Sequence, residues 1–281
     1  MEKMSFKSLN DKTCVITGGA GILGTVMAKG LAALGIKIAI VDLNKELAIK
    51  LASEIEKETG TPCLGVSANV LEKSSLELAK FEINRKLGKI DFLINGAGGN
   101  SPKATSQIEN LEIPEDFEKS FYGLQLEGFK QVFDLNFIGT LLPTMVFTTD
   151  MFEAKKGAVL NISSMSAFRS LTKVPAYSAA KAAINNFTEW LAVHLAKTGI
   201  RVNAVAPGFF LTNQNRFLLT DEKTGELTPR GHKILNNTPM AKFGEPEDLL
   251  GTVVFLLSDH ASFVTGVTIP VDGGFNAFSG V

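Results

Sequence analysis

The chain has 281 residues, of which 45% are hydrophobic and 20% charged, and its formal net charge is −1 at pH 7. This composition is typical of a globular protein, and the near-neutral charge argues against nucleic acid or an anionic membrane surface as a partner. No run of about 18 uninterrupted apolar residues occurs, so no membrane span is expected. Residues 1–10 lack a signal-peptide core, and Cys14 and Cys63 lie in apolar strand-like segments, so we expect buried thiols and a cytoplasmic location.

Short β-branched runs alternate with longer helical patterns along the whole chain. Strands are predicted at 13–17, 36–41, 90–94, 158–162, 200–205 and 267–271, and helices at, for example, 22–34, 45–58 and 178–196. Near-continuous apolar strands suit a parallel sheet that is covered on both faces. We therefore predict an α/β fold: a single doubly wound parallel sheet of Rossmann type with helices on both faces, in one domain spanning 1–281.

Two long segments interrupt this alternation. Residues 100–125 form a polar insert rich in acids, and residues 212–237 form a mixed segment that carries several cations. Long excursions in a compact domain are usually functional loops or lids, although tolerated surface insertions are the alternative. For 212–237 we favour a substrate loop because of its position in the chain.

A glycine-rich turn follows the first predicted strand. Gly19, Gly21 and Gly24 spell G-x-G-x-x-G between that strand and the first predicted helix. A turn without Cβ atoms lets backbone N–H groups approach a pyrophosphate, and the helix N-terminus favours its charge. The context of strand, turn and helix therefore predicts a dinucleotide site.

The second predicted strand ends at Asp42, whose carboxylate can accept hydrogen bonds from the adenosine ribose hydroxyls. The same carboxylate would repel a 2′-phosphate, and neither Leu43 nor Asn44 supplies a cation to offset it. We therefore predict NAD rather than NADP. The alternative is that Asp42 only caps the next helix.

Two further turns, Asn95-Gly96-Ala97-Gly98 and Ala206-Pro207-Gly208, follow later predicted strands. The carboxyl ends of the strands line the ligand crevice of an open parallel sheet, so both turns are expected on the cofactor side. Each by itself is also compatible with an ordinary turn.

Tyr177 and Lys181 lie four residues apart in a predicted helix and so share a face. An ammonium group beside a phenol lowers the pKa of the tyrosine, which makes it a proton donor or acceptor for an alcohol–ketone interconversion. The pattern is short enough to recur by chance on a surface helix. Two residues add to it: Ser164 follows the strand 158–162, and Asn136 lies in an apolar helical stretch where a buried amide needs a polar partner.

The order of these features resembles the short-chain dehydrogenase/reductase family over nearly the whole chain, from 12 to 274. The resemblance implies that Tyr177 is the general acid in reduction and the base in oxidation, and that Ser164 hydrogen-bonds the substrate oxygen. Lys181 would bind the nicotinamide ribose and lower the Tyr177 pKa, and Asn136 would hold a water that links Lys181 to solvent. Homotetramers are common in the family, so we expect one here.

The resemblance also implies a set of residues that contact the cofactor. They are Gly18, Gly19, Gly21, Ile22, Leu23, Gly24, Asp42, Leu43, Asn69, Val70, Asn95, Gly96, Ala97, Gly98, Tyr177, Lys181, Pro207, Gly208 and Thr212. The chain departs from the family pattern at three of them. Ile22 stands where the family usually has glycine, Asn69 where it often has aspartate, and Gly96 where it usually has a second asparagine.

The stretches 95–103 and 215–228, within the two long segments, resemble the D-mannonate oxidoreductase (fructuronate reductase) branch, which interconverts a keto-hexuronate and an aldonate. A sugar acid carries a carboxylate and several hydroxyls, so it needs cations and polar groups near Ser164 and Tyr177. The candidate cations are Lys103, Arg169, Lys173, Arg216 and His232, of which we favour Arg169 and Arg216.

Two alternative functions stay open. The first is a gluconate 5-dehydrogenase-like enzyme or another polyol or sugar dehydrogenase. The second is a non-catalytic NAD-binding regulator, although binding alone would not need a proton donor. No metal site is expected, because His194 and His260 show no ligand spacing and are predicted to be structural.

Overall fold

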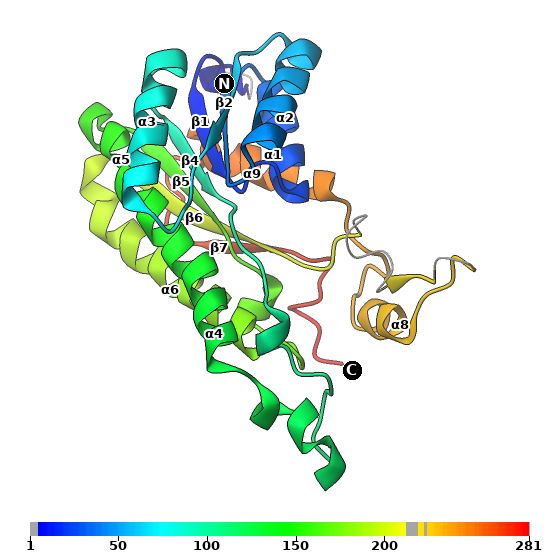
Figure 1. Cartoon of the computed structure of the whole chain (residues 1–281). Coiled ribbons are helices and arrows are strands. Elements are labelled where there is room, and N and C mark those ends of the chain that lie inside the picture. The colour runs from blue at the N-terminus through cyan, green and yellow to red at the C-terminus, as the bar shows by residue number, and fades with distance from the viewer. Residues whose placement is uncertain (1–4, 212–218, 222–223, 281) are drawn as a thin grey trace.

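The structure, a computed structural model, describes residues 5–211, 219–221 and 224–280. Its centre is a seven-stranded sheet in the order β3-β2-β1-β4-β5-β6-β7, in which every neighbouring pair is parallel (Figure 1). The strands are β1 Thr13–Thr17, β2 Lys37–Asp42, β3 Cys63–Ser67, β4 Phe92–Asn95, β5 Gly157–Ile162, β6 Ile200–Pro207 and β7 Thr268–Val271. The helices are α1 Ile22–Ala32, α2 Lys45–Thr59, α3 Lys73–Leu87, α4 Leu126–Phe133, α5 Gly139–Ala154, α6 Pro175–Leu195, α8 Pro229–Asn236 and α9 Leu250–Leu257.

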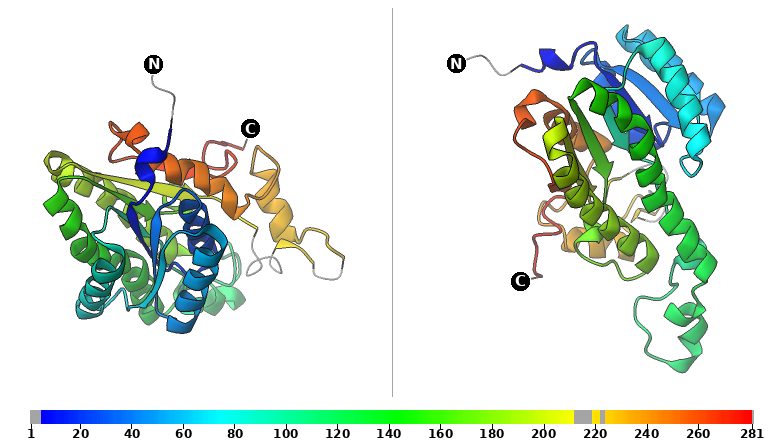
Figure 2. Two further views of the ribbon diagram at one scale, coloured as in Figure 1. Left: turned by 90° about the horizontal axis from the view of Figure 1, so that it is seen from above. Right: turned by 90° about the vertical axis from the view of Figure 1, so that its left-hand side faces the viewer.

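Helices cover both faces of the sheet, as the views in Figures 1 and 2 show. Successive strand residues point to opposite faces, so Ile16 packs with α1, α2 and α9 whereas its neighbour Val15 packs with α3, α5 and α6. Both residues are fully buried. The predicted Rossmann-type α/β fold is therefore confirmed.

The boundaries of the predicted strands and helices differ from the observed ones by at most three residues, and β3 was not among the predicted strand ranges. The helix expected to start at Ser178 starts at Pro175, because proline is well placed in the first turn of a helix, where its missing N–H costs nothing. At the C-terminal end of α2, the cap residue Gly60 adopts the left-handed conformation, with φ at 71°.

A continuous helical run joins α4 to α5 through a π-helical turn, Asp134–Ile138. Among the described residues, the run Leu126–Ala154 is the one helix that is long enough and apolar enough to cross a membrane, judged by length and composition alone. Its side chains Phe147 and Met151 are buried in the core against the sheet. Such burial is what a core helix of this composition shows.

The insert 100–125 and the region around α8 lie beyond the carboxyl edge of the sheet, at the bottom and right of Figure 1. The insert contains three short 3₁₀ turns, Pro102–Ala104, Pro114–Lys119 and Phe121–Gly123, in place of long helices. The division into one domain with an insert and a substrate loop stays a prediction.

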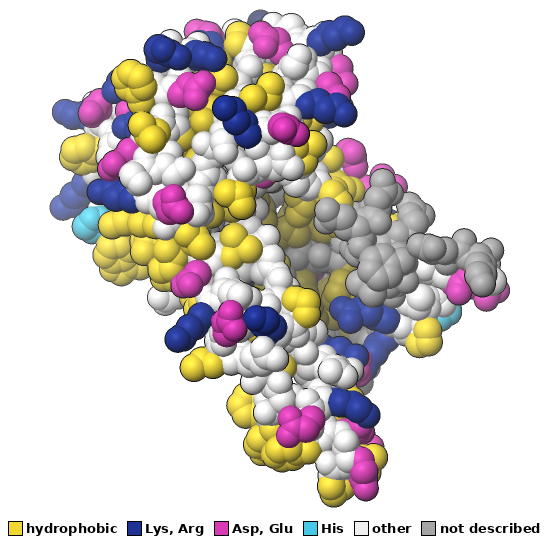
Figure 3. Space-filling view, in the orientation of Figure 1, with side chains coloured by type: hydrophobic (Ala, Val, Ile, Leu, Met, Phe, Trp, Pro, Cys, Tyr) yellow, Lys and Arg dark blue, Asp and Glu magenta, His cyan; other side chains and the backbone are white. Residues whose placement is uncertain are grey.

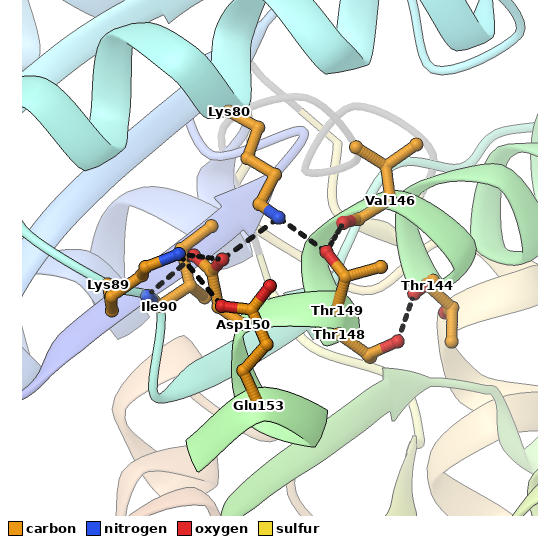
Figure 4. A network of polar contacts seen from close by, with 9 residues as sticks. All are labelled: Lys80, Lys89, Ile90, Thr144, Val146, Thr148, Thr149, Asp150 and Glu153. Atoms are coloured by element: carbon orange, nitrogen blue, oxygen red, sulfur yellow. Dashed lines mark hydrogen bonds and ion pairs between the residues drawn. The ribbon is translucent and has the colours of Figure 1, made fainter.

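A buried carboxylate fixes α3 and α5 at the start of β4 (Figure 4). Asp150 has no exposed side-chain surface, and its Oδ1 atom lies 2.9 Å from Lys80 Nζ and 3.1 Å from Lys89 Nζ. Its Oδ2 atom accepts a hydrogen bond of 3.2 Å from the Ile90 amide. Burial by itself raises the pKa of Asp150, but the hydrogen bonds from Lys80, Ile90 and Lys89 outweigh it, and the pKa lies below its ordinary value.

Replacing Asp150→Asn should lower the free energy of unfolding by about 3 kcal/mol, because it leaves the poorly exposed Lys80 ammonium without its counter-charge. Since the pKa of Asp150 is lowered on folding, its contribution is present above pH 3.8 and is lost as the pH falls through the folded value. Urea denaturation near neutral pH and at acid pH measures both effects.

The matched control is Glu153→Gln, on the same helix, because this carboxylate also pairs with Lys89 but is 64% exposed. Exposed pairs contribute at most about 1 kcal/mol. Equal losses for the two variants would contradict the assigned role of Asp150.

Candidate active site

The glycine turn after β1 brings the backbone very close to neighbouring segments. Gly18 has φ 61°, and a Cβ there would lie 2.8 Å from Ala97 Cα. A Cβ on Gly24 would lie 2.5 Å from Gly18 O. Ile22, the departure from the family pattern, is the first residue of α1, directly after the N-cap Gly21. The helix therefore starts there in ordinary helical geometry, which needs no glycine.

Asp42 lies at the lip of this turn and does not cap α2. Its Oδ2 atom accepts a 3.2 Å hydrogen bond from the Ala20 amide, and its Oδ1 atom accepts one of 3.0 Å from the Asn44 amide. The N-cap of α2 is Asn44, whose side chain accepts from Leu47 N at 3.0 Å. The alternative reading of Asp42 as a helix cap is thus wrong, and its carboxylate stands beside the glycine turn.

The turn after β4 is joined to the glycine turn. Thr17 Oγ1 accepts hydrogen bonds from the amides of Gly96 at 3.2 Å and Ala97 at 3.3 Å. A Cβ on Gly96 would lie 2.8 Å from Thr17 O, so the residue that departs from the family pattern is held against β1. The two turns therefore form one surface along the carboxyl edge.

Asn136 and Lys181 converge on this surface at Gly98. A Cβ built on Gly98 would lie 2.7 Å from Asn136 Oδ1 and 3.2 Å from Lys181 Nζ. Asn136 is fully buried on the π-helical turn, and its Nδ2 atom donates to Gly99 O at 2.7 Å and Val132 O at 2.8 Å. π-Helical turns are frequent at functional sites because they redirect one side chain out of the regular helical pattern.

Ser164 and Tyr177 meet above the end of β5. The Ser164 hydroxyl caps the short turn Met165–Ala167 by accepting from Ser166 N at 3.2 Å, and it lies beside the Tyr177 phenol, whose pKa it influences. Burial raises the pKa of Tyr177, and the neighbouring Ser164 hydroxyl acts in the opposite direction. The predicted lowering of this pKa by Lys181 is not seen here, because Lys181 Nζ lies 5.5 Å from the ring centre and donates at 2.8 Å to Ile162 O.

Lys181 is itself strongly perturbed. Its side chain is only 4% exposed, and burial lowers its pKa from 10.5 to about 8. A lysine of this kind can exchange a proton close to neutral pH. Together, Tyr177, Ser164, Lys181 and Asn136 form a group with a half-buried phenol and a buried amine.

Asn95 serves the interior of the protein. Its Nδ2 atom donates to Thr144 Oγ1 and to Asn161 Oδ1, both at 2.9 Å, and Asn161 Nδ2 donates to Thr188 Oγ1 at 2.9 Å. All four side chains are buried. A predicted cofactor contact of Asn95 can therefore come only from its backbone, whereas its side chain links α5, β4, β5 and α6.

The remaining predicted cofactor residues border the same edge. Gly208 donates its amide to Val271 O at 2.9 Å, and a Cβ there would lie 2.6 Å from Asp272 Cα. Asn69 accepts from Leu71 N at 3.0 Å and donates to Glu72 Oε1 at 2.8 Å, so its side chain shapes the local turn after β3. The others are Gly19, Leu23, Leu43, Val70 and Pro207, of which Leu43 is 74% exposed at the end of β2. Thr212 lies outside the described residues.

The predicted substrate cations are only partly at the site. Lys103 pairs with Glu127 at 3.2 Å at the base of the insert, and Arg169 is exposed after the Ser164 turn. Lys173 Nζ donates to Gln107 O at 2.8 Å. His232 is an exposed residue of α8, and Arg216 lies outside the described residues.

Other charged residues, which the sequence analysis did not choose, line a cavity at the mouth of the site. Arg230 and Lys233 of α8 face it together with Lys173 and Glu109. Figure 3 shows Lys and Arg side chains gathered beside the hollow next to α8. The sequence contained a signal for this arrangement. Thr228-Pro229 is an N-cap followed by proline and so predicts a helix start, and Arg230 and Lys233 are three residues apart, which puts them on one face of that helix.

The residues along the carboxyl edge fit an extended dinucleotide. The glycines let the turn pack against neighbouring backbone more closely than Cβ atoms would allow, the N-terminus of α1 begins at this turn, and Asp42 stands where a ribose diol would be bound. In the described ranges, no group of three or more His, Cys, Asp or Glu is placed to hold a metal ion.

Comparison with known proteins agrees with this geometry. The chain matches the family model described as enoyl-(acyl carrier protein) reductase over residues 19–276. It is 51% identical over 276 residues to the "Uncharacterized oxidoreductase UxuB" of Bacillus subtilis, with 98% of both chains covered. It is 34% identical to the 2-dehydro-3-deoxy-D-gluconate 5-dehydrogenase of Formosa agariphila, covering 96% of this chain and 94% of that one.

A crystal structure of a "putative D-Mannonate oxidoreductase" from Haemophilus influenzae with bound NAD is 48% identical. It superimposes with a TM-score of 0.92, covering 98% of this chain and 99% of that chain. The chain therefore belongs to the short-chain dehydrogenase/reductase family, and it is an oxidoreductase acting on alcohol or keto groups.

The lowered pKa of Lys181 predicts how the stability of the cofactor-free protein depends on pH. Because the pKa of Lys181 is lowered on folding to about 8, the unfolded chain binds more protons between pH 8 and 10.5, and the wild type gains stability across that window. Relative to Lys181→Met, it should gain about 3 kcal/mol between these limits. Urea denaturation of both proteins measures the difference, and a difference independent of pH would contradict the buried ammonium.

Proposed function

We propose that this protein is an NAD-dependent oxidoreductase that interconverts a keto group and a secondary alcohol on a sugar acid, with D-fructuronate and D-mannonate as the pair. The observation that carries the proposal is the convergence of the neighbouring Ser164 and Tyr177 hydroxyls with Lys181 and Asn136 beside the glycine turn. A bound nicotinamide supplies or accepts the hydride, so the protein has to orient the substrate and handle one proton.

Each member of the group has a role that its surroundings support. Tyr177 donates the proton to the keto oxygen in reduction and accepts it in oxidation, and Ser164 donates a hydrogen bond to the same oxygen. Lys181 binds the nicotinamide ribose and passes a proton, since burial brings its pKa to about 8. Asn136, held by Gly99 and Val132, positions a water beside Lys181.

NAD is favoured over NADP by the Asp42 carboxylate at the lip of the glycine turn. The Haemophilus relative with bound NAD supports the same choice. The remaining residues of the predicted cofactor set are proposed on their position along the carboxyl edge.

The choice of substrate follows the "D-Mannonate oxidoreductase" name of that relative and the cationic cavity beside α8. A gluconate 5-dehydrogenase-like activity is the second candidate, because the Formosa relative acts on a deoxygluconate. A non-catalytic NAD-binding regulator is disfavoured, because binding alone would not require a phenol beside a serine hydroxyl and a buried amine on the next turn of the same helix.

A cytoplasmic homotetramer is also proposed. The outer faces of α5 and α6 expose Met145, Phe152, Trp190 and Val193, of which Val193 is 80% exposed. Figure 3 shows a broad hydrophobic patch on the left of the molecule, where these two helices lie in Figure 1. Exposed apolar patches of this kind mark interaction surfaces, and a second copy of the chain is the proposed partner.

Purified enzyme should oxidise NADH with D-fructuronate and reduce NAD with D-mannonate, and the absorbance of NADH measures both reactions.

Tyr177→Phe should lower kcat about 1000-fold, because it removes the proton donor while keeping the ring. NADH binding, measured by fluorescence, should be retained. Activity on another sugar acid or polyol but on neither of these two would refute the substrate, and full turnover by the variant would refute the role of Tyr177.

Asp42→Ala should shift the ratio of kcat/KM for NAD over NADP towards NADP by about tenfold or more, because it removes an acceptor for the ribose diol and a charge that repels a 2′-phosphate. Asn44→Ala is the control, since it removes the α2 cap without touching the charge. A ratio that moves equally in the two variants would count against the role of Asp42.

A further inference from the structure

The mouth of the active site contains a cavity of about 260 Å³ between α8 and the loop that leads into α6. Its wall includes Val174, three residues before Tyr177, and Phe209, directly after the Pro207-Gly208 turn. The cavity is therefore bounded by both chain segments that carry or flank the reacting groups. A substrate whose reacting carbon lies at Tyr177 can extend into it.

The charges of this cavity are unbalanced. Three cations, Lys173, Arg230 and Lys233, line it against the one carboxylate of Glu109. Lys233 pairs with Glu109, and Lys173 donates to Gln107 O at 2.8 Å. No carboxylate in the described ranges pairs with Arg230, although its guanidinium has the fork geometry that binds a carboxylate through two hydrogen bonds.

Glu109 shows that a carboxylate is stabilised in this place. It belongs to the insert 100–125, and its side chain is 38% exposed. The hydrogen bond from Lys233 lowers its pKa most, desolvation opposes this, and the charges of Lys233, Lys173 and Arg230 lower it further. All three cations therefore act on one carboxylate that comes from a separate part of the chain.

Resting on the function proposed above, we propose that this cavity binds the carboxylate of the sugar-acid substrate, with Arg230 as its main ligand and Lys233 as the second. Glu109 occupies Lys233 when substrate is absent and competes with the substrate carboxylate for it. Thr172 and Asn237 also line the cavity and add polar groups to it, although the Nδ2 atom of Asn237 donates to Lys233 O at 2.7 Å. The specificity for an acid over a neutral sugar thus resides on α8, where Arg230 and Lys233 share a face three residues apart.

The test compares an acid with its neutral counterpart. D-fructose carries a hydroxymethyl group where D-fructuronate carries the carboxylate, and D-mannitol is related to D-mannonate in the same way. Arg230→Gln should raise KM for D-fructuronate about tenfold or more with kcat within about threefold, because the lost contact is the same in the ground and transition states. Arg230→Lys should recover part of the loss, since it restores the charge without the fork.

Binding to the NADH complex, measured by calorimetry, gives a readout without turnover, because neither D-mannonate nor D-mannitol can transfer a hydride to NADH. The wild type should bind D-mannonate more tightly than D-mannitol, and Arg230→Gln should remove most of that preference while leaving D-mannitol unchanged. His232→Gln is the matched control, because His232 lies on the same helix but does not line the cavity. It should leave the preference intact.

Glu109→Gln should lower KM for D-fructuronate about two- to fivefold, because Lys233 is then free for the substrate. An unchanged or raised KM would overturn the competing role of Glu109. A wild type that uses D-fructuronate but keeps its KM and its acid preference in Arg230→Gln would overturn the carboxylate site alone. A wild type that uses no sugar acid would instead overturn the proposed function.

Discussion

A buried chain of hydrogen bonds holds together the four elements on which the site depends. It runs from Thr144 of α5 through Asn95 of β4 and Asn161 of β5 to Thr188 of α6, with every donor–acceptor distance at 2.9 Å. Thr144 donates in turn to Thr140 O, and Thr140 to Asn136 O. Because an unpaired polar group in this interior is costly, a shift of any one element would break bonds in the others. The positions of Asn136, Ser164, Tyr177 and Lys181 are therefore coupled through a network of buried polar groups.

Most of the fold could be predicted from the sequence, because it depends on local signals. Buried strands such as Thr13–Thr17 are continuous apolar runs, and the glycine turn follows the first of them directly. The π-helical turn that redirects Asn136 has no such signal, since it depends on how α4 and α5 pack against the rest of the protein. The same holds for Asn95: its place after a strand indicated a ligand edge, but only tertiary packing shows its amide turned inward.

The electrostatics of the site lay even further beyond prediction from sequence. The spacing of Tyr177 and Lys181 indicates a shared helix face. The direction in which the Tyr177 pKa shifts, however, depends on burial and on the fact that Lys181 Nζ donates to Ile162 O. Arg230 and Lys233 were visible as charges of the segment 212–237, yet their value comes from facing Lys173 and Glu109, which lie far away in the chain. Pairings between distant segments carry no local pattern.

The contacts between the insert and its surroundings have a consequence for moving this site to another scaffold. Glu109 is bound to Lys233 of α8, and the neighbouring Gln107 carbonyl receives Lys173 from the loop before α6. Neither partner lies on the sheet, so the scaffold imposes no constraint on either. Exchanging the insert alone would leave the ammonium groups of Lys173 and Lys233 without their acceptors. Exchanging α8 alone would leave the Glu109 carboxylate without its ion-pair partner. The insert, the loop and α8 therefore form one matched unit, and a graft of the insert onto another scaffold keeps these contacts only when all three segments are moved together.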